Sequence, residues 1–216
     1  MNPPYKKKLL IISSGILVCL QMAIAQNTSL GIFEGHCDIG NIENKGSVIF
    51  NPDNQEYIIE GSGYNMWFDH DEFHFLWKRL KGDFILKAHA EFAGNGVELH
   101  RKIGWIIRNN LSSGSPYVSA VVHGDGLTSL QFRRTRGADT EEVKSEDQAP
   151  DIIQLERSGN IFIMSTSHNG HPFISVRIDN LNLNDKVYVG LFVCSHNPEV
   201  TEKAIFRDVS IIQQPE

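Results

Sequence analysis

Apolar and polar residues alternate along most of the chain with a period of two. The alternation is clearest in the run that begins at Phe84, where Phe84, Leu86 and Ala88 point to one side and Lys87 and His89 to the other. Successive side chains of a β-strand point to opposite faces, so this pattern indicates a strand with one buried and one solvated face.

Segments of this kind follow one another along the chain, separated by turn-forming runs such as N-P-D-N, K-G-D and S-G-N. No helical period of comparable length is present, and the short separators favour antiparallel hairpins. The segment at 187–196 is apolar on both faces, which places it inside a sheet. The predicted strands are 47–50, 56–60, 72–78, 84–92, 102–109, 117–123, 127–134, 152–157, 161–166, 173–178, 187–196 and 204–212.

The densest aromatic stretch lies at 63–78, and the prediction of a ligand-binding site starts from it. Phe73 and Trp77 share the apolar face of a strand, and this face is expected to bury the strand. Glu72 and His74 share the opposite face, about 7 Å apart along the strand. A carboxylate and an imidazole side by side are candidate ligand-binding groups.

The first residues have the pattern of a signal peptide, spanning 1–25. Three lysines precede an apolar run of twelve residues, and an A-x-A sequence predicts cleavage after Ala25. A lipoprotein signal ending at Cys19 is disfavoured because the bulky Val18 precedes it. We therefore expect a single β-sandwich domain over 26–216, located in the periplasm or secreted.

Charge and cysteine content narrow the classes of partner. The whole chain has a net charge of −6, and loss of the three leader lysines leaves 17 basic and 26 acidic residues, a net charge of −9. This charge disfavours nucleic acid and anionic membrane surfaces. No second apolar run suggests a membrane span after signal cleavage. Cys37 and Cys194 remain, and we favour free thiols over a disulfide.

One predicted connection is long, at 137–150, and carries five acidic residues and one lysine. Its composition favours a mobile, solvated loop. An acidic loop is also compatible with a structural calcium ion. Otherwise no cofactor or metal site is predicted, and the histidines are scattered along the chain.

Several motifs together resemble a known domain. The chain resembles the concanavalin A-like, jelly-roll sandwich domain of secreted bacterial proteins that often precedes TolB-like propeller repeats, and also the sandwich domains called "regulation of enolase". The resemblance covers about residues 36–212 and implies an all-β fold, a two-sheet antiparallel β-sandwich, without implying an agreed chemistry. The motifs are G-S-G-Y-N-M-W-F at 61–68, D-E-F-H-F-L-W-K at 71–78, G-D-F at 82–84, K-I-G-W-I-I-R at 102–108, H-G-D-G-L-T-S-L-Q-F-R-R at 123–134, Q-L-E-R-S-G-N at 154–160, V-Y-V-G-L-F-V-C-S-H-N at 187–197 and F-R-D-V at 206–209.

One sheet of a jelly roll is usually concave, and polar groups on its exposed face suit sugar hydroxyls while aromatic rings suit the C–H face of a sugar. The available rings are Trp67, Trp77, Trp105 and Tyr117, of which Trp77 and Trp105 are expected in the core. The candidate ligand-binding residues are Glu72, His74, Arg108, Tyr117, His123, Asp125, Gln131, Arg133 and His196.

Two structural alternatives compete with this site. Glu72, His74 and Arg108 could instead form an internal salt-bridge network. Asp125 could serve only a tight turn, as part of the run 123–126.

Three functions remain open. The first is a non-catalytic carbohydrate-binding module with a glycan as partner. The second is a glycan-active hydrolase or lyase that uses Glu72, His74, Arg108 and His123. The third is a domain that binds a protein partner. The E-x-D-x-x-E, G-x-S-x-G and H-E-x-x-H motifs are absent from the sequence, so common hydrolase chemistries lack support.

Overall fold

The computed structural model describes residues 29–213, and the predicted signal peptide with its cleavage site lies outside them. These residues form fourteen strands and no helix, so no helix there could cross a membrane. The strands make two seven-stranded antiparallel sheets stacked face to face. The predicted two-sheet β-sandwich is therefore confirmed.

The sheet that carries the site, sheet I, has β13 as an interior strand between β4 and β6, as its apolar sequence predicts. Alternate outward residues of its strands lie in rows across the sheet. In spatial order, sheet I consists of β1 (Gly35–Ile39), β4 (Phe73–Leu80), β13 (Val187–Cys194), β6 (Lys102–Arg108), β7 (Tyr117–His123), β8 (Thr128–Arg133) and β9 (Glu141–Lys144).

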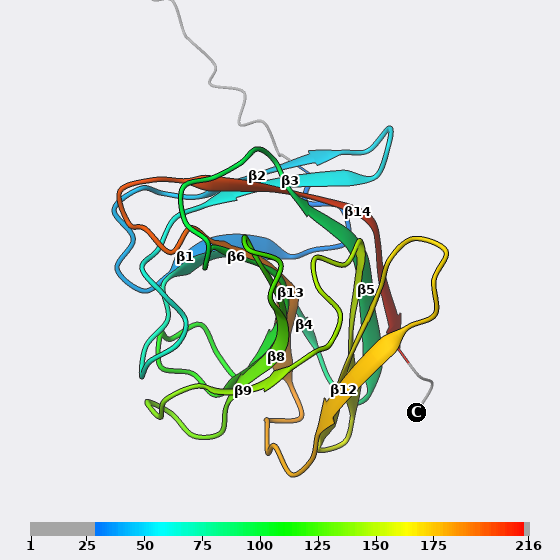
Figure 1. Ribbon diagram of the computed structural model, residues 1–216. Coiled ribbons are helices and arrows are strands. Elements are labelled where there is room, and N and C mark those ends of the chain that lie inside the picture. Colours follow the sequence, from blue (N-terminus) through cyan, green and yellow to red (C-terminus); the bar gives the residue numbers. More distant parts are fainter. Residues whose placement is uncertain (1–28, 214–216) are drawn as a thin grey trace, which may run out of the picture.

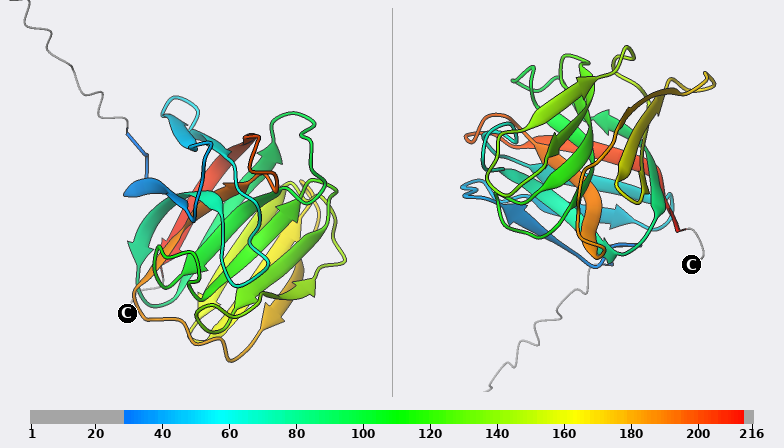
Figure 2. Two further views of the ribbon diagram at one scale, coloured as in Figure 1. Left: turned by 90° about the vertical axis from the view of Figure 1, so that its left-hand side faces the viewer. Right: turned by 90° about the horizontal axis from the view of Figure 1, so that it is seen from below.

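The second layer, sheet II, wraps around sheet I (Figure 1), and Figure 2 shows the same two layers from two other directions. Its strands β5 and β10 alternate between buried and partly exposed residues, as expected for a sheet with one solvated face. In spatial order, sheet II consists of β12 (Ile174–Ile178), β11 (Ile161–Ser167), β10 (Ile152–Ser158), β5 (Phe84–Phe92), β14 (Glu202–Gln213), β3 (Glu56–Gly61) and β2 (Ser47–Asn51).

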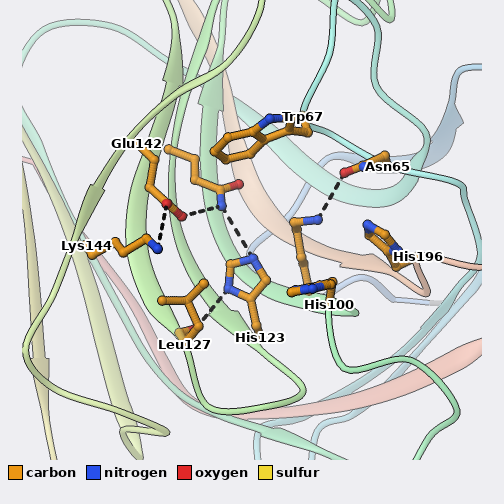
Figure 3. A pocket seen from close by; sticks show the side chains of 10 residues that line it. Asn65, Trp67, His100, His123, Leu127, Glu142, Lys144 and His196 are labelled. Atoms are coloured by element: carbon orange, nitrogen blue, oxygen red, sulfur yellow. Dashed lines mark hydrogen bonds and ion pairs between the residues drawn. The ribbon is translucent and has the colours of Figure 1, made fainter.

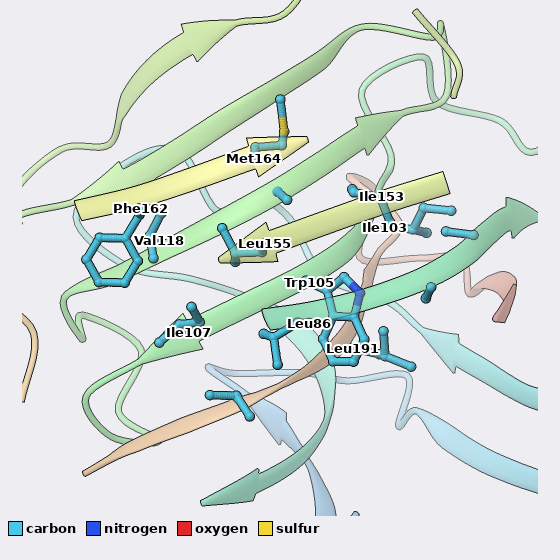
Figure 4. Close-up of a cluster of buried hydrophobic side chains, with 14 of the residues drawn as sticks. Leu86, Ile103, Trp105, Ile107, Val118, Ile153, Leu155, Phe162, Met164 and Leu191 are labelled. Atoms are coloured by element: carbon cyan, nitrogen blue, oxygen red, sulfur yellow. The ribbon is translucent and has the colours of Figure 1, made fainter. Parts of the chain in front are cut away.

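The main core fills the space between the two sheets (Figure 4). Trp105 lies there fully buried, as predicted, with Leu86 and Leu155 of sheet II and Leu191 of sheet I. Fully burying one leucine side chain contributes about 1.5–3 kcal/mol. This core holds sheet I as a rigid base for its outer face.

The outer face of sheet I has a second apolar cluster, which includes Phe73, Phe75 and Phe192. The prediction that the aromatic face of β4 buries this strand holds, but the burial is outside the sandwich, whereas Leu76 faces the main core. Trp77 packs against the outer cluster. Every residue of β6, β7 and β8 is buried, because loops cover the outer face that was expected to be an open groove.

The sequence missed two strands, β1 and β9. Neither has a clear apolar alternation, and each gains its strand geometry by pairing with a longer neighbour, β4 or β8. β9 corrects the prediction of an unstructured loop at 137–150, where Asp147 is also buried. Cys194 is a buried free thiol, as predicted, and Cys37 is a half-buried free thiol.

Candidate functional site

Polar residues at the two ends of β6, β7 and β8 form two separate groups on the outer face of sheet I. At one end Lys102 lies opposite His123, and at the other Arg108 lies opposite Tyr117, which in turn lies opposite Arg133. Six residues separate the ends of β6, a distance of about 20 Å at the rise of a strand. One end is an open pocket and the other a sealed ionic cluster.

The pocket has a volume of about 310 Å³ (Figure 3), at the lower limit of typical small-molecule sites, which run from about 300 to 1,000 Å³. Strands of sheet I contribute Lys102, His123, Gln131, Glu142 and Lys144. The connecting segments contribute Asn65, Trp67, His100, Leu127 and His196. Residues from six parts of the chain thus meet at one place.

A chain of hydrogen bonds fixes the side chains along one wall. His123 Nδ1 lies 2.9 Å from the Leu127 carbonyl oxygen, which can only accept, so Nδ1 carries the proton. Gln131 Nε2 donates to Glu142 Oε1 at 3.1 Å and approaches His123 Nε2 at 3.4 Å. Burial lowers the pKa of His123 to about 4, and the nearby Lys102 lowers it too. His123 is therefore neutral at pH 7.

Lys102 places a buried positive charge at the pocket. The residue is 2% exposed, and its Nζ donates a hydrogen bond of 3.1 Å to Asn65 Oδ1. A lysine ammonium has three N–H donors, so two are left without an acceptor among residues 29–213. Burial lowers the pKa of Lys102, while Cys194 and Glu142 act in the opposite direction.

Three histidine rings meet at the pocket. The His100 ring centroid lies 5.6 Å from that of His196 and 6.2 Å from that of His123. Burial, and then Lys102 and His100, lower the pKa of His196. No group of three or more His, Cys, Asp or Glu in the described part of the chain is arranged to hold a metal ion. A calcium site stays a prediction.

At the other end of the face, Asp71 and two arginines form what we call the Asp71 cluster. All three side chains are fully buried. Arg133 binds the Asp71 carboxylate through two N–H groups, at 2.7 and 3.0 Å, and Arg108 donates to it at 3.2 Å. Two cations around one carboxylate leave an excess positive charge, which the arginines share among backbone carbonyls, including those of Asn110 and Ala138.

The cluster and its neighbours hold the segment that carries Trp67. The Met66 and Trp67 carbonyls accept hydrogen bonds from the Thr140 hydroxyl and backbone N–H, at 3.1 and 2.9 Å, and the Phe68 carbonyl accepts one from Arg133. Three consecutive carbonyls are thereby fixed. The half-buried Trp67 ring is positioned at the pocket by bonds that originate at the sealed end of the face.

The predicted ligand-binding residues separate into three places. His123, Gln131 and His196 line the pocket. Arg108 and Arg133 belong to the Asp71 cluster. Tyr117 packs beside the cluster, where burial raises its pKa and its hydroxyl donates to the Met66 carbonyl at 2.8 Å.

The other three predicted residues contact protein groups away from both the pocket and the Asp71 cluster. The Glu72 carboxylate accepts from the Tyr64 backbone N–H at 3.0 Å. His74, 2% exposed, contacts Asp38 at 2.7 Å on the inner side of sheet I. Asp125 is exposed in its hairpin and accepts from the Leu127 N–H, which is a turn contact.

These positions correct two interpretations. Glu72, His74 and Arg108 do not form one salt-bridge network, because each has a different partner. The same three residues do not converge with His123 into the predicted alternative catalytic set, because only His123 lines the pocket. Strand alternation placed Glu72 and His74 side by side, but β4 begins one residue later, at Phe73.

Sequence reasoning missed most of the connecting-segment residues and three strand residues of the pocket. Lys102 has the same parity as Arg108 on β6, so alternation could have placed it on the outer face. Glu142 and Lys144 are two residues apart, and the same rule applied to them would have required recognising β9. His100 and Asn65 lie in segments without a period, and no signal in the sequence places them.

The sheets and the pocket define a β-sandwich of the jelly-roll type with a hollow at one end of one sheet. No protein-family model matches the chain, and no curated protein matches its sequence. The narrower resemblance to domains that precede TolB-like propellers therefore stays a hypothesis.

Solved structures do match the fold. A functionally unknown protein from Saccharomyces cerevisiae aligns with a TM-score of 0.62 at 15% identity, over 84% of this chain and 97% of that one. The carbohydrate-binding module CBM66 from Bacillus subtilis aligns with a TM-score of 0.54 at 13% identity, over 84% and 98%. A family 7 alginate lyase aligns with a TM-score of 0.50 at 10% identity, over 77% and 83%. Identities this low show a shared fold alone.

Proposed function

We propose that this protein is a secreted or periplasmic carbohydrate-binding module, and that its ligand site is the pocket at the end of sheet I. The observation that carries the proposal is the composition of this pocket. One half-buried aromatic ring, Trp67, lies among fixed donors and acceptors that include Gln131 and Glu142. Sugars need both kinds of contact, because their hydroxyls form hydrogen bonds and their C–H faces stack on rings.

The side chains of the pocket are held in place by contacts within the protein, which supports binding at a preformed site. Trp67 is held through its backbone, and Gln131 and His123 are held by the hydrogen bonds described above. Groups that are already ordered lose little conformational entropy when a ligand arrives. The two neighbours named as a carbohydrate-binding module and an alginate lyase are consistent with a glycan as ligand.

A non-catalytic role is favoured over hydrolysis by the count of carboxylates. Glycoside hydrolases use two, about 5–9.5 Å apart. Glu142 is the one carboxylate among the residues that line the pocket, and it is hydrogen bonded to Gln131. His123 is a weak base because burial lowers its pKa to about 4.

The test is a binding screen of the purified protein against bacterial, plant and host glycans. A hit should weaken about tenfold in Trp67→Ala, because an aromatic contact of about 1.4 kcal/mol is lost. Phe173→Ala is the matched control, since Phe173 is an exposed ring at 45% that does not line the pocket. Equal loss in both variants, or no hit with a folded protein, would refute the proposal. Incubation of each hit with the protein then tests for turnover.

A further inference from the structure

The charges at the pocket are unbalanced in favour of positive charge. Lys102 and Lys144 line it together with a single carboxylate, Glu142. His123 is neutral at pH 7. The pocket therefore carries an excess of about one positive charge, in a chain whose net charge is −6. A local excess against the sign of the whole protein calls for an explanation.

Lys102 is the less ordinary of the two lysines. Its charge is buried, and no carboxylate of residues 29–213 lies within ion-pair distance of it. Its one hydrogen bond goes to a neutral amide, that of Asn65. Buried charges are as a rule paired, because an ammonium removed from water loses several kcal/mol of solvation. A missing anionic partner would complete this site.

Lys144 provides a second cation at the same pocket. Its side chain is 65% exposed, and its Nζ lies 3.8 Å from Glu142 Oε2, which is near the limit of an ion pair. The other Glu142 oxygen accepts from Gln131 at 3.1 Å. Glu142 is hydrogen bonded to Gln131 and only loosely paired with Lys144. The Lys144 ammonium can therefore also contact a ligand.

We propose that the pocket recognises a sugar unit that carries one carboxylate, of the uronic-acid type, with Lys102 and Lys144 as its cationic contacts. This inference rests on the proposed function, because it names the ligand class of the same site. One negative charge matches the excess charge of the pocket. The free N–H groups of Lys102 would meet carboxylate oxygens, and Trp67 and Gln131 would remain for the ring and its hydroxyls.

The experiment compares an acidic oligosaccharide with its neutral form on one skeleton. Calorimetric titration with oligogalacturonate and with its fully methyl-esterified form isolates the charge, because the sugar ring is the same in both. We expect the acid to bind at least about tenfold more tightly than the ester. Its affinity should also fall as sodium chloride is raised, because salt screens the attraction.

Two lysine variants and a control locate the charge effect. Lys102→Met should weaken binding of the acid by about tenfold or more, and Lys144→Gln by about threefold, since Lys144 is more exposed. Lys186→Gln should leave it unchanged, because Lys186 precedes β13 at the end of sheet I away from the pocket. Thermal unfolding checks that each variant is folded, and Lys144→Gln keeps the test valid if Lys102→Met is not.

The outcomes separate this inference from the proposed function. Equal affinity for acid and ester, or binding of neutral glycans only, overturns the uronate inference and leaves a carbohydrate-binding module. Binding of a sulfated glycan without binding of the uronate overturns the choice of carboxylate. Absence of binding to every glycan by a folded protein overturns both.

Discussion

The two ends of the outer face of sheet I differ in how completely their charged groups are partnered. At the Asp71 cluster, Arg108 and Arg133 are fully buried, and they bind one carboxylate and several carbonyls. At the pocket, Lys102 is nearly as buried but has one hydrogen bond to an amide. The same three strands, β6, β7 and β8, carry both groups. Arg108 Nη1 also has no hydrogen-bond partner among the described residues, so an unpartnered N–H group does not separate the two ends by itself. What separates them is that the arginines share the Asp71 carboxylate at a closed end, whereas Lys102 has no carboxylate partner and lines an open pocket.

The largest expected effect comes from breaking the sealed end. Asp71→Asn removes the charge that two buried arginines share, and we expect the free energy of unfolding to fall by about 3–5 kcal/mol. Urea denaturation measures this change. Asp69→Asn is the control, because the Asp69 side chain is 66% exposed, and its effect should stay within about 0.5 kcal/mol. A loss below about 1 kcal/mol for Asp71→Asn would show that the cluster does not stabilise these loops.

A smaller effect follows from the pH dependence of the pocket histidine. His123 has a pKa of about 4 in the folded protein and about 6.5 when unfolded. Between these values the unfolded state binds more protons, so stability should fall as the pH drops from 6.5 to 4. The contribution lost is about 3 kcal/mol at most.

Chemical denaturation of the wild type and of His123→Asn at pH 7 and pH 4 tests this expectation. The asparagine amide can still donate to the Leu127 carbonyl, so the hairpin should survive. The variant should lose less stability on acidification than the wild type, whereas His171→Asn, at an exposed position, should behave like the wild type. Identical slopes in all three proteins would contradict the buried, neutral state of His123.

The smallest expected effect is a change in the free energy of unfolding at Lys102, and its sign distinguishes the pocket from the Asp71 cluster. Lys102→Met replaces a poorly partnered buried charge with an apolar side chain of similar volume, and such exchanges are often neutral or stabilising. We expect the free energy of unfolding to stay constant or rise by about 1 kcal/mol while ligand binding weakens. Thermal and urea unfolding measure it. A loss of more than about 2 kcal/mol would assign Lys102 a structural role like that of Arg108.

The sequence predicted the layers of this fold better than its site. Strands such as β5 and β7 were predicted with their observed bounds, because alternate residues of each must be buried against the opposite sheet. The short strands β1 and β9 depend on neighbours for their pairing, and the local sequence carries no record of those neighbours. Whether these two segments form strands therefore depends on long-range pairing, and the local pattern does not predict it.

The site was predicted in part for a similar reason. Alternation indicates which residues share a face, so it placed His123 and Gln131, which line the pocket, on the outer face and could have placed Lys102 there too. It does not indicate which loops cover that face. Carbonyls of the loop at 110–115 accept hydrogen bonds from both Arg108 and Arg133, and the Phe68 carbonyl accepts one from Arg133. Both arginines are therefore sealed, although in sequence they look as much like exposed polar residues of the outer face as Lys102 does.

The position of β9 at the end of sheet I has a consequence for how this protein can evolve. Within the described residues β9 pairs only with β8, and β12 of sheet II lies near it without pairing, so the outer edge of β9 keeps unpaired backbone groups. Its charged residues, Glu141, Glu142 and Lys144, discourage such edge-to-edge association, and two of them also line the pocket. Replacing those two with apolar residues to suit a neutral ligand would also remove the charges that keep this edge from pairing with a strand of another molecule. A substitution at Glu142 or Lys144 therefore changes the pocket and the protection of this sheet edge together.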